Sequence, residues 1–231
     1  MRKKIYAEVT NGKLFIRTGE HSGKIYDTNN ISGVKNASVI LVGNTAKTVL
    51  RIVPVPDEDI TKNEWEFLEK TLPVGNVINE VSYVFDYEFL ENKYGDKCVI
   101  AVAIPHDYAM EVVRIGTELT GSLHKINEVV PIEYVLIEHF KKLENDSYML
   151  FFPQDNGVRC IYINNNLPAA IGFISTHPSF RLKELERFFK CNNIDLKEAV
   201  LISTEPDEYS WLGDYALSIT YKEPELIYKN L

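Results

Sequence analysis

The alternation of hydrophobic and polar positions predicts many strands before residue 60 of this chain. Three short strands are expected there, at residues 5–9, 13–17 and 24–26. The turn between the first two carries Asn11-Gly12, a strong hairpin signal because both residues tolerate a positive φ. Two apolar runs on either side of Gly43-Asn44 predict a further pair of strands.

The middle of the chain mixes strands with helices. Apolar and aromatic side chains alternate with polar ones from Val81 to Glu88, which is the period of a strand with one buried face. The apolar run from Cys98 to Ala103 indicates a central strand that is buried on both faces. Amphipathic helices are expected after Pro105 and from Ile132, since each segment places its apolar side chains on one helical side. A capping box predicts a shorter helix over 62–72.

The polar stretch from Leu143 to Ser147 is the best boundary between two halves. Beyond it, strands are expected at 148–152, 158–164, 168–175, 199–203 and 214–221, with a helix at 181–190. Both halves open with three strands before any helix. This order indicates a duplicated αβ architecture, divided into residues 1–146 and 147–231.

Composition and charge narrow the class of protein. Of the 231 residues, 45% are hydrophobic, enough for a substantial core. The net charge of -8 argues against tight sequence-independent binding of nucleic acid, which relies on Lys and Arg to displace counterions. No apolar run approaches membrane-spanning length, and the N-terminal residues lack the apolar core of a signal peptide. The odd number of widely spaced cysteines suits a reducing cytoplasm better than a disulfide framework.

Motifs of common catalytic chemistry are missing from the sequence. It contains no Gly-x-Ser-x-Gly elbow, no Gly-rich Lys-Ser/Thr phosphate loop, no His-Glu-x-x-His and no Cys-x-x-Cys. His106 and Asp107 are neighbours, but adjacent side chains at a helix start point apart, so we expect no working dyad. Cys98 and Cys160 lie in strand runs and are expected to be small core residues rather than nucleophiles. No metal site is predicted.

Several longer segments follow a recognisable order. The first part reads "VILVGNTAKTVLRIVPVP", "LEKTLP", "EVSYVFDYEFL" and "CVIAVAIPHDYAMEVVRIGTELTGSLHKINEVVPIEYVLIEHF". The second part reads "SYMLFFPQDNGVRCIYINNNLPAAIGFIS" and closes with "DYALSITYKEPELIYKNL". Together these segments resemble PilM of type IV pilus assembly and the cytoplasmic domain of GspL of type II secretion. The resemblance covers nearly the whole chain.

The resemblance implies an α/β protein of the actin-like ATPase, ribonuclease H-like fold, with mixed sheets in two αβ halves. It also implies a small αβ subdomain inserted in the first half at about 37–125. Members of this family are adaptors at the cytoplasmic face of the inner membrane, where they link bitopic platform proteins to the hexameric assembly ATPase. PilM-like members can bind ATP in a cleft, and GspL-like cytoplasmic domains have largely lost this ability.

The loops that would hold the nucleotide depart from the family's pattern. The turn of the second hairpin keeps Asp155-Asn156-Gly157, where an aspartate would organise the metal and a glycine would let amides approach phosphate. Val158 and Arg159 follow, in place of small hydroxyl donors. The first hairpin lacks an Asp-x-Gly turn, and the loop "EPDEYS" lacks glycine and carries three acids. We therefore expect a degenerate cleft with no ATP or magnesium cofactor.

Without a nucleotide site, no general base or nucleophile remains, and the sequence predicts a protein-binding adaptor rather than an enzyme. The alternative is an ATP-binding or kinase-like enzyme on the same fold, which would use Asp155 with Mg-ATP. A third possibility is a phage or regulatory α+β domain unrelated to secretion.

The sequence does not mark the partner-binding surface. Tyr83, Phe85 and Tyr87 are bulky enough to anchor a partner, although a buried strand face also explains them. The first strand, at residues 4–9, is a second candidate, because an edge strand can accept a partner segment by β-augmentation.

Overall fold

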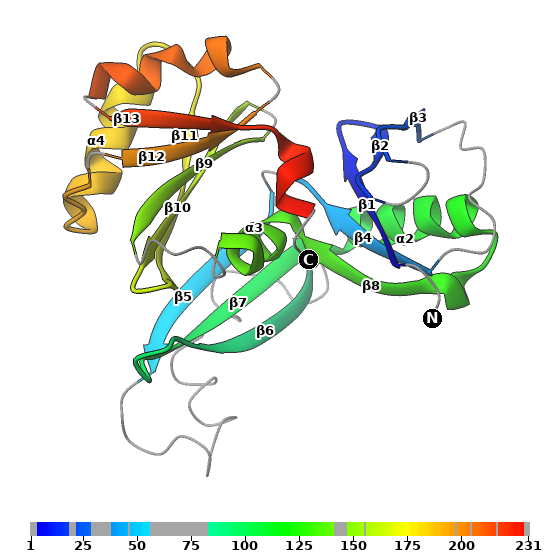
Figure 1. Cartoon of the computed structure of the whole chain (residues 1–231). Helices are drawn as coiled ribbons and strands as arrows, with labels where there is room; N and C mark the ends of the chain where they lie inside the picture. Colours follow the sequence, from blue (N-terminus) through cyan, green and yellow to red (C-terminus); the bar gives the residue numbers. More distant parts are fainter. Residues whose placement is uncertain are drawn as a thin grey trace.

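The structure is a computed structural model, and it describes the chain in ten stretches (Figure 1). They are residues 4–18, 22–28, 38–45, 47–55, 83–140, 147–154, 156–196, 198–203, 205–215 and 217–228. Three β-sheets form from these residues, and two of them have five strands each. The helix predicted at 62–72 lies outside the described residues.

The first sheet has the strand order β3-β2-β1-β4-β8. Its strands are β1 (Lys4–Thr10), β2 (Lys13–Ile16), β3 (Ile25–Asp27), β4 (Ser38–Gly43) and β8 (Ile126–Pro131). The first three are antiparallel, and β4 and β8 run parallel to β1. Asn11 and Gly12 have φ values of 48° and 69°, so the predicted hairpin turn is confirmed.

The second sheet repeats this topology with the order β11-β10-β9-β12-β13. Its strands are β9 (Tyr148–Gln154), β10 (Gly157–Asn164), β11 (Leu167–Ser175), β12 (Glu198–Ile202) and β13 (Ser218–Lys222). Again three antiparallel strands are followed by two parallel ones. The same order in both sheets confirms the predicted duplication. The final strand begins at Ser218, later than predicted, because Pro206–Tyr215 forms the 3₁₀ segment η5.

The third sheet is smaller and has the order β5-β7-β6. It contains β5 (Val49–Val55), β6 (Tyr83–Glu91) and β7 (Lys97–Pro105). β7 is central and buried from Cys98 to Ile104, as predicted for that apolar run. The prediction that the two runs around Gly43-Asn44 pair with each other was wrong, because β4 joins the first sheet and β5 joins the third.

The ends of the predicted insertion belong to the first sheet. Residues 37–125 were assigned to the inserted subdomain, but β4 is a strand of that sheet and α2 (His106–Thr120) packs on it. At Gly116 the helix comes so close to the sheet that an added Cβ would overlap the Leu41 side chain. The segment with a sheet of its own therefore runs only from β5 to β7. The division at 146/147 stays a prediction.

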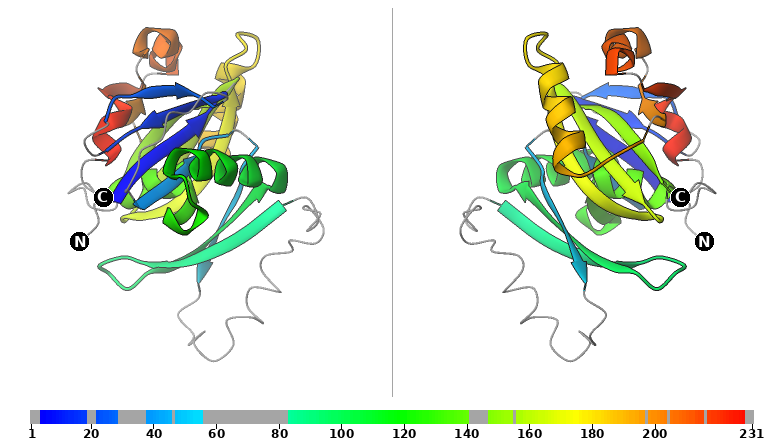
Figure 2. Two further views of the ribbon diagram at one scale, coloured as in Figure 1. Left: turned by 90° about the vertical axis from the view of Figure 1, so that its right-hand side faces the viewer. Right: turned by 90° about the vertical axis from the view of Figure 1, so that its left-hand side faces the viewer.

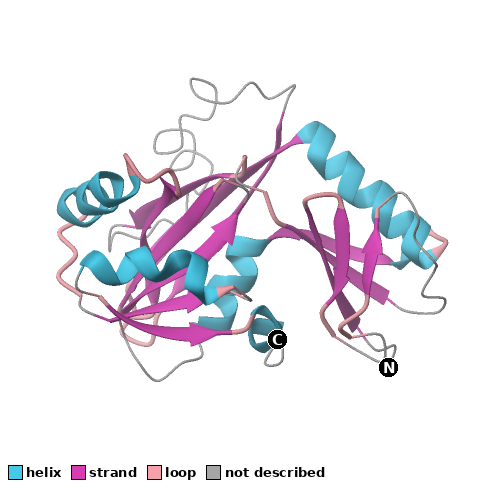
Figure 3. Cartoon of the chain, turned by 90° about the horizontal axis from the view of Figure 1, so that it is seen from above, coloured by secondary structure: helices cyan, strands magenta, loops and turns pink. Residues whose placement is uncertain are grey.

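The other helices lie on the two halves at different places. α3 (Ile132–Phe140) follows β8 and lies between the two larger sheets (Figure 3). α4 (Arg181–Cys191) covers the outer face of the second sheet with Leu185 and Phe189 (Figure 2). A 3₁₀ segment, η6 (Pro224–Tyr228), returns from the second sheet and contacts α3. Among the described residues, no helix combines the length and apolar character needed to cross a membrane.

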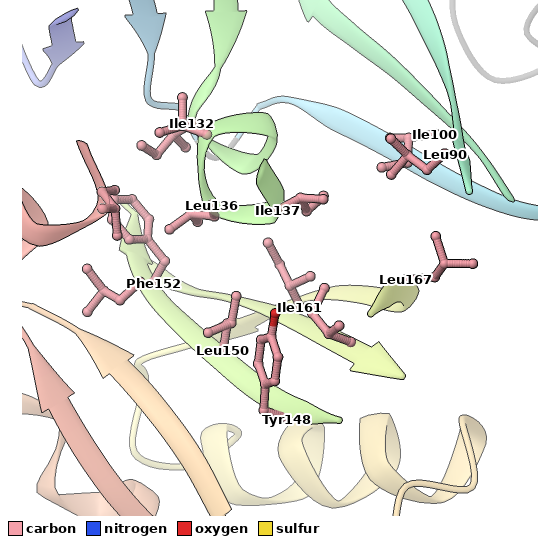
Figure 4. Close-up of a cluster of buried hydrophobic side chains, with 14 of the residues drawn as sticks. Leu90, Ile100, Ile132, Leu136, Ile137, Tyr148, Leu150, Phe152, Ile161 and Leu167 are labelled. Carbon is pink, nitrogen blue, oxygen red and sulfur yellow. The ribbon is translucent and has the colours of Figure 1, made fainter. Parts of the chain in front are cut away.

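One hydrophobic core joins all three sheets around α3 (Figure 4). Ile132 and Leu136 of α3 are fully buried in it. The second sheet contributes Leu150 and Ile161, and the third contributes Ile100. Since these side chains exclude water from one common volume, the two halves and the third sheet are packed as one body.

A polar contact ties the third sheet to the second. Asn92, at the turn between β6 and β7, is 8% exposed. Its Oδ1 accepts hydrogen bonds from the amides of Tyr94 and Asp96, both at 2.9 Å. Its Nδ2 donates to Asp96 Oδ2 at 2.8 Å and to the carbonyl of Asn165, in the β10–β11 turn, at 2.9 Å. One side chain thus shapes its own turn and holds that turn against the second half.

Replacing this amide should weaken the whole fold. We expect Asn92→Ala to lower the free energy of unfolding by about 2–3 kcal/mol, because it removes four hydrogen bonds made by one buried side chain. Urea denaturation measures the change. Lys97→Ala is the matched control in the same hairpin, since Lys97 makes only an exposed ion pair with Glu91 and should cost less than about 1 kcal/mol. Equal losses in both variants would contradict the structural role of Asn92.

Candidate functional site

A cleft of about 430 Å³ lies between the first and second sheets. One wall consists of β1, β2 and β3 with the turn at Asn11, and the other of the end of β9, the end of β12, and η5 and η6. The cleft therefore lies beside the turns of both hairpins, where the sequence predicted remnants of a nucleotide site. Its chemistry depends on which polar side chains are still available to a ligand.

Glu8 is the acid that β1 places in the cleft wall, and it is 1% exposed. Arg17, directly after β2, donates from Nε to Glu8 Oε2 at 2.7 Å and from Nη1 to Glu225. Asn44 donates to Glu8 Oε1 at 2.8 Å, and the Tyr228 hydroxyl donates to Oε2 at 3.1 Å. Both oxygens of Glu8 are thus occupied by groups of the chain itself.

Burial, together with the neighbouring Glu8 carboxylate, raises the pKa of Tyr228 well above its ordinary value. Its hydroxyl therefore stays protonated and donates to Glu8. The Tyr228 ring also lies 5.7 Å from the ring of Tyr6, centroid to centroid. η6 is thereby fastened to β1 by a hydrogen bond and by an aromatic contact.

A second acid, Glu133 at the start of α3, is fully buried behind the cleft. Arg159 of β10 approaches it with Nε at 3.0 Å, and Gln154 of β9 donates to the same carboxylate oxygen at 3.1 Å. Arg159 also donates to the carbonyl of Thr48 at 3.1 Å. Burial raises the pKa of Glu133, while the Arg159 guanidinium acts in the opposite direction and favours the carboxylate.

The two acid–arginine pairs belong to one connected network. Gln154 Nε2 also donates to Asn44 Oδ1 at 3.2 Å, and Asn44 in turn donates to Glu8. The path from Glu8 through Asn44 reaches the second half at Gln154 and returns to Glu133 of the first half. Each carboxylate in it has an arginine of its own. Both contacts of Glu133 go to Oε1, and its buried Oε2 has no hydrogen-bond partner among the described residues.

The second hairpin turn contains the predicted residues Asp155, Asn156 and Gly157. Asp155 lies outside the described residues. The carbonyl of Asn156 accepts hydrogen bonds from the backbone amide and the hydroxyl of Thr176, at 3.2 and 3.1 Å. Beside Gly157, an added Cβ would overlap the Phe173 ring and lie 2.6 Å from the carbonyl of Ile174. The space that glycine leaves open is therefore filled by Phe173.

The other sequence-predicted groups behave as ordinary structural residues. Cys98 and Cys160 are buried, and burial raises the pKa of the Cys160 thiol, as expected of core residues. His106 Nδ1 and Asp107 Oδ1 are 3.9 Å apart at the exposed start of α2. Within the described stretches, no group of three or more His, Cys, Asp or Glu side chains is placed to hold a metal ion.

A separate groove of about 210 Å³ lies between β1, β4, β8, α3 and the third sheet. Glu88, Glu128 and Glu138 line it, so its charged groups are all acidic. Tyr6 and Tyr134 give it aromatic walls. Burial raises the pKa of both tyrosines, with further contributions from Glu128 near Tyr6 and from Asp86 and Glu88 near Tyr134. β6 and β8 are edge strands of their sheets, so each has one side without a neighbouring strand among the described residues.

Two of the predicted partner residues, Tyr83 and Tyr87, lie on the other face of β6, in alternation with Glu88, which lines the groove. The side chain of Phe85 lies outside what the structure describes. Tyr87 instead packs beside Val99 and Ala101 of β7 and meets Phe89 edge to face at 6.0 Å. A role for these three aromatics in partner binding stays a prediction. The prediction that the first strand is an edge open to a partner segment was wrong, because β1 pairs with β2 on one side and β4 on the other.

Sequence reasoning noted Arg159 only as a departure from a phosphate loop, and it missed Glu8 and the residues that complete the network. These are Arg17, Asn44, Glu133, Gln154 and Tyr228. A usable signal was present in the strands, since a charged or amide side chain inside an apolar run must find a partner when the strand is buried. Gln154 and Arg159 both occur in such runs.

Comparison with solved structures identifies the fold as that of actin-like ATPases. A Bacteroides thetaiotaomicron protein with an actin-like ATPase fold and unknown function aligns with 97% of this chain and 95% of its own, with a TM-score of 0.58 and 12% identity. A chain of the PilM–PilN type IV pilus biogenesis complex aligns with 97% of this chain and 89% of its own, with a TM-score of 0.58 and 12% identity.

The cytoplasmic domain of EpsL, an inner membrane component of the type II secretion system of Vibrio cholerae, aligns with 97% of this chain and 92% of its own. Its TM-score is 0.52 and its identity 8%. The α/β actin-like fold and the likeness to PilM and GspL-type domains, predicted from the sequence, are confirmed at the level of structure. No protein-family model and no curated protein matches the sequence.

The ion pair behind the cleft gives a testable stability difference. We expect Arg159→Met to lower the free energy of unfolding at pH 7 by about 3–5 kcal/mol, because it leaves the Glu133 carboxylate buried without a counter-charge. Loss of the guanidinium also raises the pKa of Glu133 further above its unfolded value. Protonation then favours the folded state, so the deficit should shrink as pH falls from about 8 to about 5. Urea denaturation at several pH values measures both effects.

Two further variants control this experiment. Arg114→Met removes an exposed arginine that pairs with Glu118 on α2, and it should cost less than about 1 kcal/mol at any pH. The double variant Glu133→Gln/Arg159→Met removes both charges and should recover most of the stability. A loss of less than about 1 kcal/mol in Arg159→Met, or one independent of pH, would contradict the assigned pairing.

Proposed function

We propose that this chain is a non-catalytic adaptor of a type IV pilus or type II secretion-like assembly platform. It would act at the cytoplasmic face of the inner membrane and link bitopic membrane proteins to the assembly ATPase. The observation that carries the proposal is the state of the cleft, where the two buried acids are each neutralised by an arginine of the chain itself.

A working ATP site on this fold would need oxygen ligands for the hydrated magnesium ion and open backbone amides for the phosphates. Glu8 has both oxygens occupied, and Glu133 accepts from Arg159 and Gln154. Phe173 fills the space beside Gly157 that a phosphate oxygen would otherwise approach. These three features support the expectation that the cleft no longer binds a nucleotide.

Two of the structural neighbours, the chain of the PilM–PilN complex and the EpsL domain, support a role in an assembly platform. One belongs to a complex of PilM with PilN, and the other is the cytoplasmic domain of an inner membrane component. A chain of this fold that binds such components would need a recognition surface outside the cleft. The groove between the first and third sheets offers one.

The chemistry of this groove favours a basic, extended segment of a membrane partner. Glu88 and Glu128 would attract Lys or Arg side chains, and Tyr6 and Tyr134 offer ring faces to the same cations. The free edges of β6 and β8 can donate and accept main-chain hydrogen bonds from an extended segment. Juxtamembrane segments on the cytoplasmic side are enriched in Lys and Arg, which matches the acidic lining.

The second candidate is the ATP-binding or kinase-like enzyme, and the size of the cleft favours it. A volume of about 430 Å³ falls within the range of small-molecule sites. In that case Asp155 would organise Mg-ATP, and the arginines would have to leave their carboxylates when nucleotide binds.

Titration of Mg-ATP separates the two candidates. The adaptor proposal predicts no heat of binding and no rise in melting temperature at millimolar nucleotide. A ligand at ten times its Kd would add about 1.4 kcal/mol of stability and raise the melting temperature by about 3–5 °C. Binding that is lost in Asp155→Ala but kept in Asp195→Ala, an exposed acid elsewhere, would establish the enzyme candidate instead.

The groove is tested with the cytoplasmic tail of a bitopic membrane protein encoded beside this chain, prepared as a fluorescent peptide. We expect Glu88→Gln/Glu128→Gln to weaken its binding about five- to twentyfold in anisotropy titrations, and added salt to weaken wild-type binding in the same way. The matched control is Glu111→Gln/Glu198→Gln, which removes two exposed acids outside the groove and should change the affinity less than about twofold. Equal affinities for both double variants would count against the groove.

A further inference from the structure

The start of α4 carries an arginine that is stacked on a buried tryptophan. The guanidinium carbon of Arg181 lies 5.1 Å from the centroid of the Trp211 ring. Trp211 belongs to η5, is only 4% exposed, and packs in the core of the second half. The guanidinium thus makes a cation–π contact with the indole, and its planar fork can bind a carboxylate through two parallel hydrogen bonds.

Two donors at this point have no acceptor in the described part of the chain. They are Arg181 Nε and Trp211 Nε1, and both atoms are buried. A buried donor without an acceptor is unfavourable by about 1–3 kcal/mol, more when it is charged. The acids of α4 do not fill this role, because Glu184 accepts from the amide of Ser175 at 2.7 Å and Glu186 pairs with Lys190. Both atoms are sealed from solvent, so an outside acceptor would bind the terminal nitrogens of Arg181, which is only half-buried.

Exposed apolar side chains flank the same arginine. Phe180 is 55% exposed and Leu182 is 39% exposed. The ring of His177 lies 5.2 Å from that of Phe180 and braces it. Exposed aromatic and arginine side chains near one another are typical of protein interfaces, which are enriched in both.

The charge of α4 is opposite to that of the whole molecule. The helix carries Arg181, Lys183, Arg187 and Lys190 against Glu184 and Glu186, whereas the chain has a net charge of -8. Figure 2 shows α4 on the outer face of the second sheet, away from the first sheet, and no residue of α4 lines the groove. This basic surface is thus separate from both sites described above.

We infer that the start of α4 is a docking surface for an acidic segment of another protein. A carboxylate of that segment would accept hydrogen bonds from the Arg181 guanidinium, and a neighbouring apolar side chain would contact the exposed ring of Phe180. The inference goes beyond the groove and does not depend on it. An adaptor must contact two partners, and this surface would serve the second.

Selection from a random dodecapeptide phage library tests the surface. The library is selected in parallel on the wild-type chain and on Arg181→Ala, each checked for unchanged thermal unfolding. Wild-type selection should enrich peptides that combine Asp or Glu with an aromatic or aliphatic residue. The most enriched peptide, made synthetically, should bind Arg181→Ala at least about tenfold more weakly.

The fluorescence of Trp211 provides a second measurement of peptide binding at this surface. In a Trp65→Phe background it is the sole tryptophan, and peptide binding should change its fluorescence. Arg181→Lys keeps the charge but loses the planar fork, so binding should fall about three- to tenfold. Lys190→Ala removes the same charge from the exposed end of α4 and should change affinity less than about twofold. The inference fails if no peptide is enriched, if enrichment lacks acidic residues, or if Arg181→Ala and Lys190→Ala behave alike.

Discussion

The buried carboxylate of Glu8 is the interaction on which the arrangement of the two halves depends. A charge buried at this depth is unfavourable unless it is paired and hydrogen-bonded. Arg17 supplies the opposite charge, and Asn44 and Tyr228 supply hydrogen bonds. These partners come from the end of β2, the end of β4 and from η6. Satisfying one carboxylate therefore fixes three separate segments around the cleft.

Glu133 is likewise buried and paired with an arginine, in this case one from the second half. Its partners Gln154 and Arg159 belong to the second sheet, and Gln154 also reaches Asn44 of the first half. The halves are thus joined by a polar network in addition to the core around α3. In this fold the cleft between the halves is the place for a ligand. Here the side chains that line it and lie behind it connect the halves to each other.

The strands and the duplicated topology were predictable because they follow from local patterns. Alternation, buried apolar runs and the Asn11-Gly12 turn each depend on residues that are close in sequence. Strand pairing does not, so β4 and β5 were paired with each other although they belong to different sheets. The network was missed for the same reason, since Glu8 and Tyr228 are 220 positions apart. Arg159 was noticed as a departure from a phosphate loop, but its partner Glu133 could not be identified from the sequence.

The positions of the surfaces follow from how the charges are distributed. Arg17 and Arg159 are buried beside their acids and add little positive charge to the surface. The charged side chains that line the groove beside the third sheet are glutamates. α4, on the far side of the second sheet, carries four basic side chains against two acidic ones (Figure 2). Two surfaces of opposite sign would select different partners and would keep each from the other's place. That separation is what linking two proteins requires, and a catalytic cleft would not need it.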